Sequence, residues 1–96
     1  MNIGPKTQHL EFFENLEQLY LQYNCIERIG LNSLQFNVKL QMLNLSNNKI
    51  TEIEGISHLP ELAFLDMSNN LIENYNPEED LPQSTIILRM RDNPFE

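Results

Sequence analysis

The sequence has only one cysteine, Cys25, among its 96 residues, so it cannot form a disulfide within the chain. Small secreted proteins usually depend on disulfides, whereas intracellular proteins keep their thiols reduced. Residues 1–15 also lack the basic start, the uninterrupted apolar run and the small-residue cleavage site of a signal peptide. We therefore expect a cytoplasmic location.

Positive charge is scarce as well, with 6 Lys and Arg against 14 Asp and Glu and a net charge of -8. An acidic surface repels the phosphates of nucleic acids and anionic lipid head groups. No stretch approaches the roughly 18 consecutive apolar residues of a membrane-spanning helix. We expect the partner to be another protein, of unknown identity, and neither nucleic acid nor membrane. The acidity itself indicates either a solvated surface or attraction to a basic partner.

What the sequence does contain is an internal repeat. Three segments beginning at Leu16, Leu40 and Leu62 share the pattern LxxLxLxxNxI, with Met67 in place of one leucine. A weaker fourth copy begins at Thr85, so successive copies are separated by 24, 22 and 23 residues. This pattern at this period is typical of leucine-rich repeats. We expect a single domain with the return segment of a preceding repeat and four repeats: 1–15, then 16–39, 40–61, 62–84 and 85–96.

Each repeat predicts one short strand. Leucines two positions apart, such as Leu19 and Leu21, point to one face of a strand, and the residue between them points to the other. The chain returns to the same side after each strand, so the strands are expected to pair in parallel. The predicted fold is an α/β solenoid of about four coils. Its short parallel β-sheet forms the concave face, and short helical or 3-10 segments form the convex face.

An asparagine follows each predicted strand, where the chain bends inward and leaves backbone N–H and C=O groups in the interior. A buried side-chain amide can both donate to and accept from such groups. One unpaired buried group would cost about 1 to 3 kcal/mol. We expect a structural ladder formed by Asn24, Asn48, Asn70 and Asn93. The residues two positions later are expected to face the core: Ile26, Ile50, Ile72 and Phe95.

The return segments carry a three-residue apolar spacing, which suits one helical turn or a 3-10 stretch. It is clearest in Ile53, Ile56, Leu59 and Leu62, where Pro60 limits the length of any helix. The first return is two residues longer and is expected to bulge on the convex side, with the apolar set Leu31, Leu34, Phe36 and Val38. The segment NYNPEEDLPQS has two prolines around three acidic residues and predicts an irregular acidic loop.

The outward side chains of the strands are the candidate binding site. This concave grid has twelve members: Gln18, Tyr20, Gln22, Met42, Asn44, Ser46, Phe64, Asp66, Ser68, Ile87, Arg89 and Arg91. Four are large apolar or aromatic groups that the core does not need, and they are expected to form a stripe: Tyr20, Met42, Phe64 and Ile87. An exposed apolar patch with a polar rim is typical of a protein interface, although such side chains can also simply cover one another.

Charged groups lie beside this stripe at Asp66, Arg89 and Arg91. They either orient an acidic or helical partner or form a solvated surface pair worth less than about 1 kcal/mol.

The sequence offers little for catalysis. Its two histidines, His9 and His58, fall in return segments, away from Cys25. A reactive thiol needs an electropositive neighbourhood that the sequence around Cys25 lacks. The acidic residues 78–80 are consecutive in a loop without further ligands, so a solvated turn is favoured over a metal site. We expect no enzyme activity, no cofactor and no metal.

Both ends resemble unfinished coils. Leu10, Phe13 and Leu16 repeat the spacing of a return segment, and the sequence stops at DNPFE without an evident C-terminal cap. Terminal units of a repeat stack need a polar outer side. Three explanations stay open: the chain is a piece of a longer protein, a neighbouring subunit covers the open end, or the last residues form a cap of their own.

The segments LEQLYLQYNCIERI and LQMLNLSNNKITEIEGISHLPEL resemble intracellular leucine-rich repeats of about 22 residues. That class includes the regulatory subunit of protein phosphatase 1, outer-arm dynein light chains and several ciliary proteins. The resemblance covers Leu10 to Phe95, and LPQSTIILRMRDNPF is similar to the last repeats of small ciliary and flagellar proteins. It implies a scaffold that grips proteins on its concave sheet, with a cytoskeletal or ciliary location. The longer first return and the missing cap depart from the family pattern.

Two functions in different classes follow from these features. One is a module that binds a partner protein reversibly on its concave face, and the other is a permanent structural subunit of a larger assembly. A reversible module is expected to be soluble alone once its open ends are capped, whereas a structural subunit exposes apolar ends and aggregates or unfolds in isolation. A secreted receptor-type repeat is disfavoured because the sequence lacks disulfides and a signal peptide.

Overall fold

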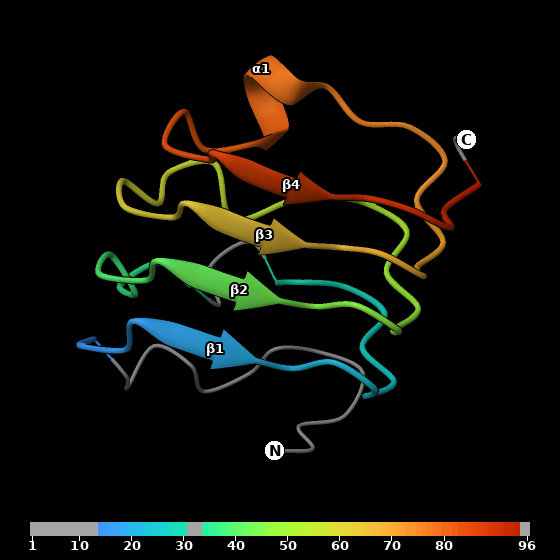
Figure 1. Cartoon of the computed structure of the whole chain (residues 1–96), viewed down its shortest axis with the longest axis horizontal. Coiled ribbons are helices and arrows are strands. Elements are labelled where there is room, and N and C mark those ends of the chain that lie inside the picture. The colour runs from blue at the N-terminus through green and yellow to red at the C-terminus, as the bar shows by residue number, and fades with distance from the viewer. Residues whose placement is uncertain (1–13, 31–33, 95–96) are drawn as a thin grey trace.

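The computed structural model describes residues 14–30 and 34–94, and in these it has four three-residue strands and one short helix. The strands are β1 (Gln18–Tyr20), β2 (Met42–Asn44), β3 (Phe64–Asp66) and β4 (Ile87–Arg89). The helix α1 spans Pro77–Asp80, between β3 and β4. The strands lie side by side in the order of the sequence, and all run in the same direction (Figure 1).

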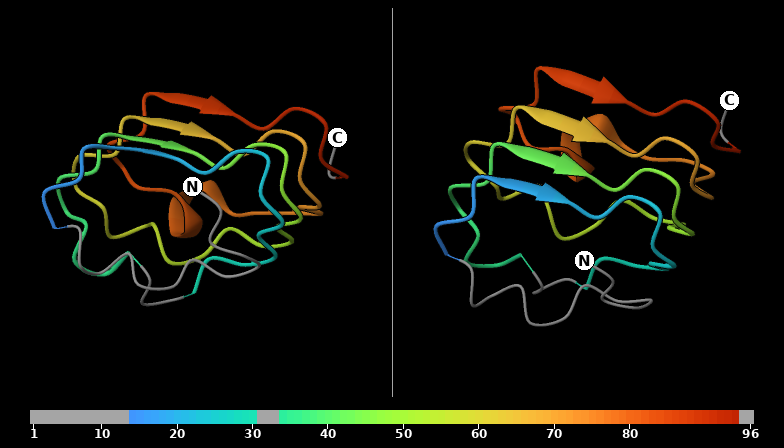
Figure 2. Two further views of the ribbon diagram at one scale, coloured as in Figure 1. Left: turned by 90° about the horizontal axis from the view of Figure 1, so that it is seen from below. Right: turned by 60° about the horizontal axis from the view of Figure 1, so that its bottom comes forward.

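One residue of each strand faces the interior, and pairing keeps these residues in register. Leu19 pairs with Leu43, Leu43 with Leu65, and Leu65 with Leu88. The turns of successive coils stack on the opposite wall, as the end-on view shows (Figure 2). The predicted solenoid with a parallel sheet on one face is therefore confirmed.

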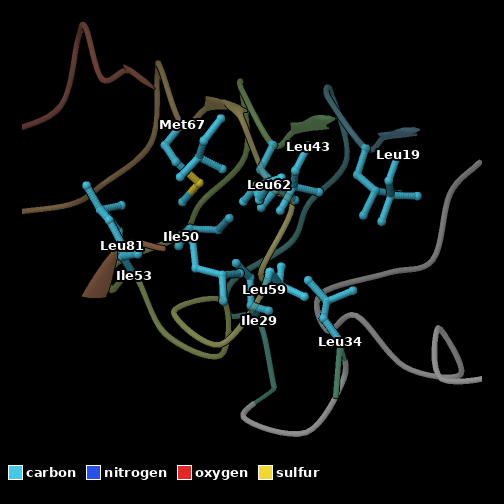
Figure 3. Close-up of a cluster of buried hydrophobic side chains, with 14 of the residues drawn as sticks. Leu19, Ile29, Leu34, Leu43, Ile50, Ile53, Leu59, Leu62, Met67 and Leu81 are labelled. Atoms are coloured by element: carbon cyan, nitrogen blue, oxygen red, sulfur yellow. The ribbon is translucent and has the colours of Figure 1, made fainter. Parts of the chain in front are cut away.

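The core fills the space between the sheet and the return segments (Figure 3). From the strand side it receives the central leucines and the residues two positions on, such as Leu45 and Met67, which are buried. Ile26, Ile50 and Ile72 turn inward after the strands and are also buried, whereas Phe95 lies outside the described residues. A fully buried side chain of this size stabilises the fold by about 1.5 to 3 kcal/mol.

The convex side of the described chain contains little helix and returns through short turns, in keeping with the single turns or 3-10 stretches that the sequence predicts. The return through Ile56 and Leu59 is a turn closed by a 3.1 Å hydrogen bond from the backbone N–H of Leu59 to the carbonyl of Ile56. The next residue, Pro60, has no N–H to continue a helix. Within the described residues only α1 is a helix, and it is a single turn in the acidic loop.

Two features of the sequence make that turn helical. The Asn76 side chain accepts a hydrogen bond from the N–H of Glu78 at 3.0 Å, and Pro77 occupies the first helical position. Both arrangements favour a helix start. After the helix, the buried Leu81 anchors the loop to the core.

The longer first return contributes fewer apolar groups to the core than its composition suggests. Leu34 is buried, but Phe36 and Val38 are about half exposed, and Leu31 lies outside the described residues. The chain instead turns inward at Asn37, which is fully buried, and at Leu40. Backbone hydrogen bonds from Asn37 to Leu34 (3.3 Å) and from Leu40 to Asn37 (3.1 Å) close these turns.

Besides Leu31, four residues named in the sequence analysis fall outside the part of the chain that the structure describes: His9, Leu10, Phe13 and Phe95. In residues 14–30 and 34–94, no helix has the length and apolar character needed to cross a membrane.

Candidate functional site

The outward side chains of the sheet form three columns across the strands. The first column is Gln18, Met42, Phe64 and Ile87. The second column is Tyr20, Asn44, Asp66 and Arg89. The third column lies two residues further on, just beyond the strands, and comprises Gln22, Ser46, Ser68 and Arg91.

The first column carries the apolar surface of the sheet. Met42 and Phe64 are partly exposed, and Ile87 is 48% exposed. The core does not require large apolar groups at these outward positions, because Leu43 and Leu65 fill it on the other side of the strands. Three neighbouring apolar side chains on an outward face are the kind of patch that marks interaction sites.

Tyr20 does not belong to that column, which corrects the four-residue stripe expected from the sequence. Its strand pairs Gln18 with Met42, so Tyr20 stands next to Asn44 instead. The ring is 50% exposed, and the hydroxyl donates a 3.3 Å hydrogen bond to the Oε1 atom of Gln18. The cause is register: Tyr20 is the third residue of its strand, whereas Met42 is the first residue of its own.

Asp66 and Arg89 are paired across β3 and β4 in the sheet, but their side chains interact with other groups. The guanidinium carbon of Arg89 lies 5.3 Å from the centroid of the Phe64 ring, which is a cation–π distance. The Asp66 carboxylate accepts a hydrogen bond from the backbone N–H of Ser68 at 3.0 Å. Phe64 therefore belongs to the apolar column and also contacts the positive charge of Arg89.

The third column is less accessible than the sequence predicts. Ser46 is buried, with 7% of its surface exposed, because its backbone N–H (3.0 Å) and its hydroxyl (2.7 Å) both donate to the Oδ1 atom of Asn44. Gln22 and Ser68 are partly buried, and Arg91 is exposed. Ser46 is thus a poor contact residue, whereas Arg91 remains available to a partner.

Asparagine side chains bind neighbouring coils to one another beneath the end of the sheet. Asn48 accepts hydrogen bonds from the backbone N–H of Asn24 (3.1 Å) and of Ile26 (3.2 Å) one coil earlier. Its amide nitrogen donates to the carbonyl of Leu21 in that coil (3.1 Å) and to the carbonyl of Leu45 in its own (2.9 Å).

The same arrangement recurs in the next coils. Asn70 accepts from the N–H of Ile50 at 3.1 Å, and Asn93 accepts from the N–H of Ile72 at 3.1 Å. Asn24 is only partly buried, and its amide donates to the carbonyl of Leu21 within its own coil at 2.9 Å. These contacts give the asparagines a structural role.

The residue before each of these asparagines has a left-handed backbone, which sequence reasoning missed. The φ angles are 59° at Tyr23, 59° at Asn47, 57° at Asn69 and 61° at Asp92. Asparagine and aspartate tolerate this conformation, whereas a bulky residue does so only with strain. The paired asparagines in the repeated SNN segments were the available signal, and Tyr23 departs from it.

A shallow hollow of about 450 Å³ lies on the flank of the coils, beyond the ends of the strands. Its lining is mostly charged, including Glu27, Lys49 and Glu52, and Arg28 forms an ion pair with Glu54 at 3.2 Å. The charged lining therefore comprises three glutamates and two basic residues, with the ion pair between Arg28 and Glu54 among them.

His58 and Cys25 lie in different segments of the chain. His58 donates from Nε2 to the carbonyl of Leu34 at 2.9 Å in the return segments, whereas Cys25 is exposed in the turn that follows β1. Within residues 14–30 and 34–94, no three His, Cys, Asp or Glu side chains are grouped so as to hold a metal ion. His9 lies outside these residues.

Comparison with known proteins gives a consistent assignment. A family model described as "Leucine rich repeat" matches residues 14–72. The chain is 46% identical over 82 residues to acidic leucine-rich nuclear phosphoprotein 32 family member A of Drosophila pseudoobscura pseudoobscura, which covers 78% of this chain and 31% of that protein. It is 36% identical over 80 residues to prolargin of Mus musculus, which covers 81% of this chain and 21% of that protein.

A third relative, osteomodulin of Bos taurus, is 32% identical over 84 residues, covering 83% of this chain and 19% of that protein. The chain thus spans between about a fifth and about a third of the length of these three relatives.

Proposed function

The chain belongs to the leucine-rich repeat family, and from that premise we propose that it binds another protein on the concave face of its sheet. The contact residues are the members of the three outward columns other than the buried Ser46, with the apolar side chains in the first column and polar or charged side chains in the second and third. Recognition of this kind uses no catalytic residue, cofactor or metal.

One observation supports the concave face over the rest of the surface. Met42, Phe64 and Ile87 lie on adjacent strands in a single column and remain partly exposed, although the core is already filled from the other side of the sheet. Binding energy in protein interfaces is concentrated in such large apolar and aromatic groups when a partner buries them. Phe64 stands in the middle of the column, so we assign it the anchoring role.

The proposal is tested by replacing Phe64 with the photo-crosslinking residue benzoylphenylalanine in the intact chain. We expect irradiation in a native lysate to give a discrete adduct that mass spectrometry identifies, and unlabelled chain to compete for it. The matched control carries the same crosslinking residue in place of Phe36, another phenylalanine, which lies on the convex side and is half exposed. Adducts that form at position 36 but not at position 64 would refute the proposed site.

A double variant, Met42→Ala with Phe64→Ala, gives an independent check of the same site. It should lose the captured partner while its circular dichroism spectrum is unchanged. The control double variant, Phe36→Ala with Val38→Ala, removes comparable exposed apolar groups elsewhere and should retain the partner.

A permanent structural subunit is the second function we propose, and exposed isoleucines at β4 support it. Ile86 is 82% exposed and precedes Ile87 at the outer strand of the described sheet. Such a subunit should self-associate when isolated, and Ile86→Asp should suppress the association in sedimentation experiments. A reversible module, in contrast, should sediment as a monomer with or without this substitution.

We also propose a cytoplasmic location, with a cytoskeletal or ciliary position as the more specific form. The exposed thiol of Cys25 supports a reducing compartment. One relative has the word "nuclear" in its name, so imaging of the tagged protein should score nucleus, cytoplasm and cilium separately.

A further inference from the structure

We infer that the concave face selects a short acidic protein segment, with carboxylates over β4 and an adjacent apolar side chain over Phe64 and Met42. This inference rests on the proposed function and adds the chemistry of the partner. It follows from how charge is distributed on the sheet.

The concave columns are basic at one edge although the chain as a whole is acidic, with a net charge of -8. Their charged members are Asp66, Arg89 and Arg91, all on the last two strands or just beyond them. The one acidic member, Asp66, already accepts a hydrogen bond from Ser68. On this face a partner's carboxylate therefore meets two arginines and one aspartate, whose carboxylate already accepts a hydrogen bond from a backbone N–H.

The other basic groups of the described chain are placed differently. Arg28 is bonded to Glu54 on the flank, and Lys49 lines the same hollow as Glu52. Arg28 is thus paired with a carboxylate, and Lys39 and Lys49 are exposed outside the three outward columns. Arg89 and Arg91 belong to those columns, and among the described residues neither forms an ion pair with a carboxylate. Charge complementarity thus favours an anionic group at the β4 edge and not on the flank.

The two arginines are suitably spaced for this purpose. Arg89 ends β4 and Arg91 follows it by two residues, so the two exposed guanidinium groups come from neighbouring positions and can serve one segment. Arg89 rests against the Phe64 ring at 5.3 Å, which restrains its side chain before any partner arrives. A planar guanidinium binds a carboxylate through two parallel hydrogen bonds.

The opposite edge of the face gives the segment a direction. Gln18, Tyr20 and Gln22 on the β1 side are polar and uncharged, so they hold no counter-charge for a carboxylate. The apolar side chain of the partner then falls on Phe64 and Met42, between the two edges. Because the chain repels long acidic tracts through its net charge, the segment should carry few carboxylates close to an apolar residue.

The probe for this inference is a random peptide library displayed on phage and selected on the intact chain. Enriched peptides should contain Asp or Glu next to Leu, Phe or Met, and their synthetic forms should bind in fluorescence anisotropy. The double variant Arg89→Glu with Arg91→Glu should weaken their binding by about tenfold or more. Selection on that variant should instead enrich Lys and Arg.

The matched control is Lys39→Glu with Lys49→Glu, which makes the same change in net charge at exposed positions outside the concave columns. It should alter affinity by no more than about twofold, since distant surface charges are screened by salt. An equal loss in both double variants would overturn the inference in favour of a general charge effect. Unchanged thermal unfolding verifies that each variant is folded.

The outcomes separate this inference from the proposed function. If enriched peptides require Phe64 but lack acidic residues, the acidic preference is wrong and the concave site stands. If the peptides bind Phe64→Ala and the arginine variant as tightly as they bind the unmodified chain, both proposals fail. Failure to enrich any peptide overturns the short-segment inference. Dimers that dissociate in the arginine variant would replace the acidic segment with a second copy of this chain.

Discussion

The side-chain amide of Asn48 donates a 3.1 Å hydrogen bond to the carbonyl of Leu21, 27 residues earlier, and so joins two coils. The same side chain accepts from two backbone N–H groups of the earlier coil. One side chain therefore bonds backbone groups of two coils at once, and the Leu21 carbonyl accepts in addition from Asn24 of its own coil.

Asn48→Ala should lower the free energy of unfolding by about 2 to 4 kcal/mol, because the backbone N–H groups of Asn24 and Ile26 lose their acceptor and three carbonyls each lose one of their donors. Urea denaturation followed by circular dichroism measures this change. Asn48→Asp keeps the acceptor and loses the donor, and it also brings a carboxylate next to the carbonyls of Leu21 and Leu45, so it should destabilise the fold as well. The control Asn74→Ala, at an exposed position, should change stability by less than about 0.5 kcal/mol. Equal effects at positions 48 and 74 would refute the role of the ladder.

Tyr23→Asn should stabilise the protein by about 0.5 to 1 kcal/mol, because the backbone there is left-handed and asparagine tolerates that conformation better. The ring is 78% exposed, so little packing is lost. Tyr23→Val at the same site should do the opposite, since a β-branched side chain is least compatible with a positive φ. A stability change of the same sign in both variants would show that backbone strain is not the cause.

Adjacent residues of β3 should respond very differently to truncation. Leu65 is fully buried, and Leu65→Ala should cost about 2 to 5 kcal/mol. Phe64 is partly exposed on the outward face, so Phe64→Ala should cost about 1 kcal/mol, mainly through its contact with Arg89. Thermal unfolding of the two variants in parallel measures the difference, and similar losses would contradict the assignment of faces.

The ion pair between Arg28 and Glu54 should contribute little to stability. The Arg28 side chain is about half exposed, and such pairs are worth at most about 1 kcal/mol. Arg28→Ala should therefore lower the free energy of unfolding slightly at low salt, and the difference should vanish at high salt as the charges are screened. A loss that persists at high salt would mean that the arginine stem packs against its neighbours.

The sequence predicted the strands and their register because that information is local and repeated. Leu19, Leu43 and Leu65 recur with the same neighbours, so alternation alone assigns one face to the core and the other to solvent. The columns of the candidate site follow from the same alternation. Tyr20 faces outward as predicted, but it was placed in the apolar stripe because large side chains were grouped by type, whereas strand pairing puts it beside Asn44.

The return segments were harder to predict because whether a side chain is apolar does not determine whether it is buried there. In the first return, Phe36 and Val38 are apolar but half exposed, whereas Asn37 is fully buried. The three-residue spacing of Leu34, Asn37 and Leu40 held the correct information, since turns closed by hydrogen bonds between residues three apart bring every third residue inward. A prediction based on apolar residues alone misses this period, because Asn37 is polar. The interaction of Arg89 with Phe64 depends on side-chain direction, which no local pattern specifies.

The way in which the strands are ordered has a mechanical consequence. Each strand pairs only with the strand before and after it, and among the described elements none connects β1 directly to β4. A pulling force applied at β1 and β4 would therefore pass through each coil in series. Extension should proceed by peeling away one coil at a time, beginning with the weakest junction, and should appear as a staircase of small steps instead of one rupture.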